Sequence, residues 1–311
     1  MKAYRALCVA AAVAAFCLVV LGAYVRLSNA GLGCPDWPLC YGRAMPAQIA
    51  DAASAAKAWK EMAHRYLAGS LGILIVVLAA AAWRLRRSHR LATVIIALVA
   101  LQATLGMWTV TMLLKPAIVT AHLLGGMATL ALLTWLALAQ WPHAEGAAMR
   151  ALRLIAVLAL TALAVQIALG GWVSANYAAL ACPDLPLCRG KLVPPMDFAN
   201  GFHVVRELGQ TAEGTPLSPD ALTAIHWSHR AFALVVVALA WIASARAWRL
   251  APGLARLVAA AAALQFALGV ANVATGLPLA LAAAHNAGAA LLLVSLVVLN
   301  FFAFRALRPA P

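Results

Sequence analysis

The sequence predicts an all-α integral membrane protein with eight transmembrane helices, arranged as two tandem four-helix bundles. Hydrophobic residues make up 65% of the 311 residues and charged residues only 10%, whereas a soluble chain carries about 25% charged residues. Apolar runs of roughly 20 residues indicate transmembrane helices. Eight such runs follow one another, at 4–27, 64–84, 91–113, 118–141, 151–175, 224–246, 254–276 and 280–304. The first run is too long for a cleaved signal peptide and is followed by similar runs.

The net charge of +14 indicates membrane topology, and we expect no nucleic-acid partner. The cationic residues gather in alternate connections and at the two ends of the chain, whereas the short third and seventh connections hold only Lys115. By the positive-inside rule, both termini are cytoplasmic. The loops that carry four of the six cysteines then lie on the outer, oxidising side of the membrane, where disulfides persist.

Between the first two spans, glycines and prolines at 31–42 predict an ordered turn. The Ala-rich segment 47–60 predicts a short amphipathic helix on the membrane surface, and the second span then begins at His64.

Sequence motifs of the first half recur in the second. The segment 182–188 copies 34–40 at an offset of 148 residues, because 182 − 34 = 148. The pair His229-Arg230 copies His64-Arg65 at an offset of 165, and His285 copies His122 at 163. The larger second offset indicates an insertion in the second outer loop, between Cys188 and His226.

Two units of four spans therefore make up the chain, one in residues 1–145 and one in 146–311. Each is expected to be an antiparallel bundle with its polar site between the helices. Because four is an even number, both copies have the same orientation and form parallel repeats.

Four histidines occupy matching places at the outer starts of spans two, four, six and eight: His64, His122, His229 and His285. Ionisable groups within spans are costly and tend to mark function. Two imidazoles on facing helices can approach opposite faces of one porphyrin and supply both axial ligands, whereas zinc needs three or four clustered ligands. The pattern predicts haem, against the alternative that each ring only bonds a neighbouring backbone. Nearby glycines would leave room for a flat ring: Gly69, Gly72, Gly125, Gly126 and Gly288.

The two halves differ three residues before the shared His-Arg pair, where the first has Glu61 and the second has His226. Residues i and i+3 share a helix face, so we expect Glu61 to lie over the same pocket as His64. Such a carboxylate could act as acid or base, or it could be an ordinary interfacial acid. Arg65 and Arg230 could bind haem propionates, or could reach towards lipid phosphate.

Each outer loop holds two cysteines separated by five residues and braced by two prolines. Such a pair can close a small disulfide ring, which would serve either as a loop staple or as an exchangeable redox disulfide. The remaining histidines lie in connections, where we expect exposure: His89, His143 and His203.

Taken together, these motifs resemble the haem A synthase family, bacterial relatives of the mitochondrial cytochrome-oxidase assembly factor, over essentially the whole chain. The resemblance implies a bacterial inner-membrane oxidoreductase that converts haem O to haem A for terminal oxidase assembly. The C8 methyl group would be oxidised through an alcohol to a hydrated aldehyde, which loses water. The expected partners are haem O and haem A, membrane lipid, haem O synthase, a terminal oxidase subunit and a second copy of the chain.

The resemblance also implies roles for individual residues. His229 and His285 would hold a resident haem b, while His64 and His122 would bracket the substrate haem O, with Glu61 as the catalytic carboxylate beside it. Disulfides would join Cys34 to Cys40 and Cys182 to Cys188. His226 could compete for the iron, but His229 is preferred because it matches His64 in the His-Arg register.

Other functions also fit parts of the pattern. A di-haem b protein that carries electrons between quinol and a periplasmic partner would suit the four histidines equally well. A thiol–disulfide redox protein without haem would need only the cysteines, and a haem transporter would need only the pocket. The presence of Glu61 in one half alone and the unequal outer loops favour an enzyme.

Overall fold

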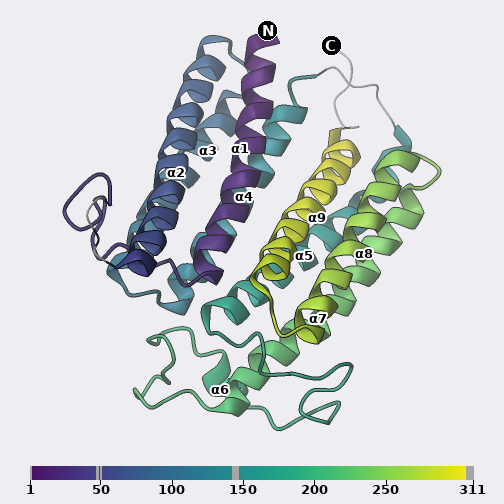
Figure 1. Ribbon diagram of the computed structural model, residues 1–311. Helices are drawn as coiled ribbons and strands as arrows, with labels where there is room; N and C mark the ends of the chain where they lie inside the picture. Colours follow the sequence, from purple (N-terminus) through teal and green to yellow (C-terminus); the bar gives the residue numbers. More distant parts are fainter. Residues whose placement is uncertain (1, 47–48, 50, 142–146, 306–311) are drawn as a thin grey trace.

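The computed structural model describes residues 2–46, 49, 51–141 and 147–305, and this part of the chain is helical (Figure 1). Within it, eight helices are long and apolar enough to cross a membrane, which confirms the prediction of an all-α, multi-pass membrane protein. The elements in chain order are α1 (Lys2–Leu27), α2 (Ala52–Arg84), α3 (His89–Thr111), α4 (Pro116–Leu138), the 3-10 turn η1 (Ala147–Leu152), α5 (Arg153–Ala175), the short α6 (Phe198–Gly201), α7 (Pro219–Ala247), α8 (Pro252–Ala274) and α9 (Leu279–Arg305).

Residues that favour helix initiation mark the starts of these helices. The Asp51 carboxylate accepts a hydrogen bond from the Ser54 backbone N–H and caps α2, and the Ser218 hydroxyl accepts one from Ala221 N–H and caps α7. Proline opens α4, α7 and α8, where its missing N–H costs no intrahelical bond and its fixed φ suits the first turn.

The helix α2 corrects one prediction. The expected surface helix at 47–60 and the expected span from 64 are one continuous helix that begins at Ala52. Alanine is the strongest helix former, and no helix-breaking residue lies between 52 and 64. The helix capped by Asp51 therefore continues without interruption into the membrane span. His64 is therefore 12 residues from the helix start (64 − 52), or about 18 Å along the axis. Residues 47, 48 and 50 of that prediction lie outside the described part of the chain.

The long helices contact one another in two rings. In the first, α1 contacts α2 and α4, and α3 contacts α2 and α4; in the second, α5 contacts α7 and α9, and α8 contacts α7 and α9. Contacts of α4 with α5, and of α9 with α1 and α4, join the rings. The α9 helix is the most enclosed span, and it is tied to α5 by the Asn300 amide, which donates to the Ala156 carbonyl at 2.9 Å.

The start of α1 and the end of α9 lie at one end of the molecule, while the long loops lie at the other (Figure 1). The second of these loops, at 176–218, contains α6 and accounts for the expected insertion after Cys188. It is held by the Trp172 indole N–H, which donates to the Gly201 carbonyl at 2.8 Å, and by the Arg206 guanidinium, which donates to the Asn176 side chain at 2.7 Å. An exposed ion pair between Lys115 and Glu207 connects this loop to the α3–α4 turn.

Candidate haem-binding site and its outer loops

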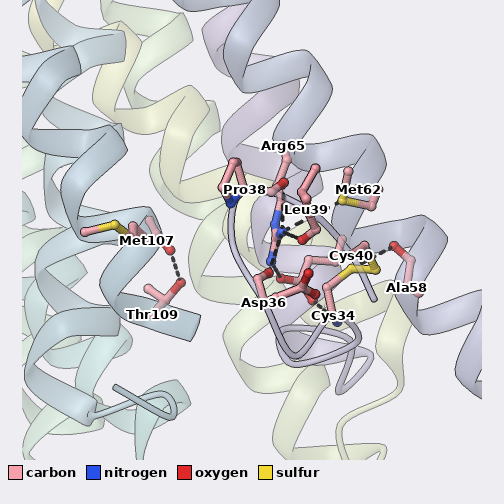
Figure 2. Close-up of polar contacts among 12 residues, drawn as sticks. Cys34, Asp36, Pro38, Leu39, Cys40, Ala58, Met62, Arg65, Met107 and Thr109 are labelled. Atoms are coloured by element: carbon pink, nitrogen blue, oxygen red, sulfur yellow. Dashed lines mark hydrogen bonds and ion pairs between the residues drawn. A yellow bond between two sulfur atoms is a disulfide. The ribbon is translucent and has the colours of Figure 1, made fainter. Parts of the chain in front are cut away.

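The first outer loop is closed by a disulfide between Cys34 and Cys40 and anchored to α2 by Arg65 (Figure 2). The Arg65 guanidinium donates to the backbone carbonyls of Asp36 and Leu39 at 3.0 and 2.8 Å. A guanidinium carries five N–H donors in a fixed fork, so one side chain can hold several carbonyls of a tight loop. Arg65 is thus a loop anchor that lies one residue after His64.

Glu61 connects the same loop to the same helix turn. It is 4% exposed, and one carboxylate oxygen accepts from the Cys34 backbone N–H at 2.9 Å while the other pairs with Arg65 at 2.5 Å. Both oxygens of Glu61 therefore have donors within the loop anchor, and the carboxylate lies between the disulfide and the His64 turn.

The second outer loop has the same construction with one exchange. A disulfide joins Cys182 to Cys188, and Arg230 donates to the carbonyls of Asp184 and Leu187, both at 3.0 Å. In place of the carboxylate, His226 Nδ1 accepts from the Cys182 N–H at 3.1 Å. His226 is thus engaged by the loop, which leaves His229 as the ring directed between the helices.

An aspartate turns the backbone within each loop. The backbone N–H groups of Gly42 and Tyr41 donate to Asp36 at 2.8 and 2.7 Å, and these bonds hold the pKa of its carboxyl below the ordinary value. Asp184 has the same arrangement in the second loop. The backbone N–H groups of Gly190 and Arg189 donate to its carboxylate, and these bonds lower the pKa of the carboxyl.

These lowered pKa values predict how the loops respond to acid. Because the carboxyl pKa is lower in the folded loop, its stabilisation is complete above the unfolded pKa of about 3.9 and is lost as pH falls through the folded pKa. Hydrogen exchange over 36–43, corrected for intrinsic rates, should therefore show constant protection from neutral pH down to roughly pH 4, and loss below it. Asp36→Asn should lose protection at every pH; unchanged protection in that variant would contradict the role of the carboxylate.

Each of the four predicted ligand histidines lies against a glycine of a neighbouring helix. A Cβ built on Gly22 would lie 2.9 Å from His64 Cε1, and one on Gly170 would lie 3.0 Å from His229 Cε1. Similarly, a Cβ on Gly106 would lie 3.3 Å from His122, and one on Gly269 would lie 3.2 Å from His285. Any side chain at these positions would force the ring to move, so the glycines fix the depth at which each ring sits between the helices.

The structure brings His229 and His285 together. Their ring centroids are 6.4 Å apart and the ring planes are inclined at 79°. Two imidazoles bound to opposite sides of one metal ion through bonds of about 2 Å would have ring centres roughly 6 Å apart. The described residues contain no group of three or more histidine, cysteine, aspartate or glutamate side chains that could hold a metal ion. A pair at this spacing fits a two-axial-ligand cofactor such as haem better than it fits a zinc ion.

In the first half, His64 and His122 lie close enough to interact electrostatically. The Nδ1 atoms of His64, His122 and His285 are buried without a hydrogen-bond partner among the described residues. Buried polar nitrogens normally have a partner, so unpaired ring nitrogens on paired histidines are consistent with ligand-binding groups. These rings, too, fit a haem-binding role.

Two of the glycines expected to make room for a flat ring have open space beside them, and the other three lie next to side chains of other residues. A Cβ on Gly69 or Gly72 would meet nothing within 4 Å, so neither faces a histidine. Gly125 and Gly288 accommodate the side chains of Gln102 and Gln265. The relevant glycines belong to neighbouring helices, and at the sequence level only the matching offsets of the two halves could have indicated them.

Of the three remaining histidines, which were expected to be exposed, one agrees with the prediction and one does not. His203 is exposed in the second outer loop. His89 is half-buried, with its ring centroid 5.0 Å from that of Trp83, and His143 lies outside the described residues.

A residue absent from the sequence predictions also contacts a candidate ligand. The Gln166 side-chain amide on α5 lies 3.1 Å from His229 Nδ1 and donates to the His229 carbonyl at 3.0 Å. Gln166 has no glutamine counterpart in α1, so the repeat could not reveal it.

Comparison with known proteins extends over nearly the whole chain. The model of the COX15-CtaA family, described as cytochrome oxidase assembly protein, matches residues 5–297. A protein named Heme A synthase from Shewanella oneidensis is 40% identical, over 92% of each chain. Proteins of the same name from Caulobacter sp. strain K31 and Caulobacter vibrioides are each 30% identical, over 96% and 94% of this chain and 94% and 93% of their own.

Proposed function

We propose that this chain, which belongs to the COX15-CtaA family of cytochrome oxidase assembly proteins, is a membrane-bound haem A synthase that oxidises haem O to haem A. The observation that carries this proposal is the set of paired histidines seated on glycines of neighbouring helices, with His229 and His285 at 6.4 Å. The names of the relatives at 30–40% identity supply the reaction. The C8 methyl group of haem O becomes an alcohol, then a hydrated aldehyde that loses water to give the formyl group.

The two halves have separate roles in this proposal. Residues 1–145 form the substrate half, in which His64 and His122 bracket haem O, and residues 146–311 form the half in which His229 and His285 hold a resident haem b. The matching helix contacts, α1–α4 in one ring and α5 with α7–α9 in the other, support the interpretation as tandem, parallel four-helix units. Haem b, when bound, would supply one-electron redox chemistry.

Glu61 is our candidate for the catalytic carboxylate. A carboxylate stands at this position only in the substrate half, since the second half has His226 there. Glu61 lies within one helical turn of His64 and is buried beside the disulfide loop. Arg65 and Arg230 hold the outer loops through backbone carbonyls, so their first role is to fix each loop to the helix that carries His64 or His229. A propionate contact would be additional to that role.

The membrane orientation follows from charge. If both termini are on the cytoplasmic side, the cationic connections lie there too and satisfy the positive-inside rule. The two disulfides then face the oxidising side of the membrane. We therefore place the protein in the bacterial inner membrane with the substrate pocket near its outer face. Haem O synthase and a subunit of the terminal oxidase are the partners that such an enzyme would exchange haem with.

The test is haem extraction and chromatographic identification from cells that make haem O, with and without this protein. We expect haem A only when the protein is present. If the purified protein carries only haem b, and haem O stays unchanged with a working electron acceptor, the protein is a di-haem electron carrier and the synthase proposal is wrong.

A further inference from the structure

The helices α1 and α5 can be compared residue by residue, because they end at Leu27 and Ala175, 148 residues apart (175 − 27 = 148). The same offset relates Gly22 to Gly170 (170 − 22 = 148). The ring of His64 packs against Gly22, and the ring of His229 packs against Gly170. One turn earlier on the same helix face, the offset pairs Leu18 with Gln166. The two candidate iron sites therefore differ at this position.

On the second-half side, Gln166 holds His229 in two places. Its amide nitrogen lies 3.1 Å from ring Nδ1 and 3.0 Å from the backbone carbonyl oxygen of the same residue. Because one amide contacts both the ring and the main chain, the ring cannot rotate without losing a bond. Gly170 lets the ring pack closely against α5, because a Cβ at that position would lie only 3.0 Å from His229 Cε1. If Nε2 of His229 binds iron, Nδ1 carries the ring proton and needs an acceptor. Turning the Gln166 amide over would present its oxygen, which is otherwise buried without a partner among the described residues, to that N–H.

On the first-half side, no such restraint exists in the described residues. Leu18 is aliphatic, and His64 Nδ1 is buried without a hydrogen-bond partner there. His64 has the glycine support of Gly22 but not the hydrogen bond.

We propose that Gln166 is a positioning residue that makes the His229–His285 site a permanent haem site, and that Leu18 leaves the His64–His122 site free to exchange haem. The proposal rests on the proposed function, since it explains why one of two similar pockets retains its haem while the other takes in substrate and releases product. Groups that orient a metal-bound histidine through its second nitrogen commonly change metal affinity or activity by about 10–100-fold.

The experiment compares Gln166→Met with Gln140→Met in the full-length protein, purified in detergent. Both variants replace an amide by an unbranched side chain of similar length, but Gln140 is a buried residue whose amide donates to Leu136 and Ser88 rather than to a histidine. The readouts are the rate at which ferric haem b passes to excess apomyoglobin and the low-temperature EPR spectrum of the ferric haem. Wild-type protein is measured first, and absence of haem b from it would overturn the proposed function itself.

We expect Gln166→Met to release haem b about 10–100-fold faster than wild type, with a shifted or broadened EPR signal, while Gln140→Met matches wild type. Unchanged release and spectrum in Gln166→Met, or equal acceleration in both variants, would overturn the proposal. The reciprocal Leu18→Gln keeps the test open if Gln166→Met cannot be purified. It should raise the amount of haem O and haem A that copurifies, relative to haem b, and an unchanged amount would contradict the assignment of this difference to position 18.

Discussion

Replacing either proposed haem ligand of the second half, in His229→Ala or His285→Ala, should remove essentially all haem b from the purified protein and abolish haem A formation. The two rings lie 6.4 Å apart, and each is packed on a glycine. Loss of one ring would leave haem b with one histidine in place of two, and would leave the removed ring's volume unfilled. The measurement is the pyridine haemochrome content of the protein, together with extracted haem A.

The matching changes in the first half should have the opposite pattern. His64→Ala and His122→Ala should retain haem b at the wild-type level and still abolish haem A formation. His203→Ala, in an exposed part of the second outer loop, is the control and should change neither quantity. If haem b instead disappears in the first-half variants and persists in the second-half variants, the assignment of the two halves must be reversed.

The four histidines stand out in the sequence because the repeat gives each one a counterpart, and the structure brings His229 and His285 of the second half together; their role as haem ligands stays a prediction. The same offsets predicted the two cysteine loops, and the structure contains both disulfides. What the sequence could not give is the direction in which a long side chain reaches. Arg65 and Arg230 follow the histidines directly, yet their guanidinium groups bind loop carbonyls that lie 26 to 29 and 43 to 48 residues away.

The start of α2 and the glycine supports were missed for different reasons. The first error came from treating 47–60 and the following span as separate elements, although Ala-rich sequence without a breaker continues one helix. The second could not be avoided, because which glycine faces a given histidine depends on how two helices are rotated and shifted against each other. Local sequence places Gly69 and Gly72 near His64, but only packing places Gly22 against its ring.

Glu61→Gln should leave both haems bound and slow the oxidation of haem O before the aldehyde stage by about 10²–10⁴-fold, the usual contribution of a positioned acid or base. The substitution preserves the shape of the side chain. A glutamine oxygen can still accept from the Cys34 N–H, which lies 2.9 Å from the present carboxylate, but the ion pair with Arg65 is lost. The measurement is the ratio of alcohol intermediate to haem A among the extracted haems.

Glu61 has two possible roles, and the second half supplies the control that separates them. His226 accepts the Cys182 N–H at 3.1 Å, in the place where Glu61 accepts that of Cys34. His226→Gln therefore alters the loop contact alone, without removing a carboxylate. If loop anchoring were the whole function of this position, both glutamine variants would convert haem O normally as long as their disulfides formed. Accumulation of the alcohol in Glu61→Gln, with full conversion in His226→Gln, would instead assign the chemistry to the carboxylate.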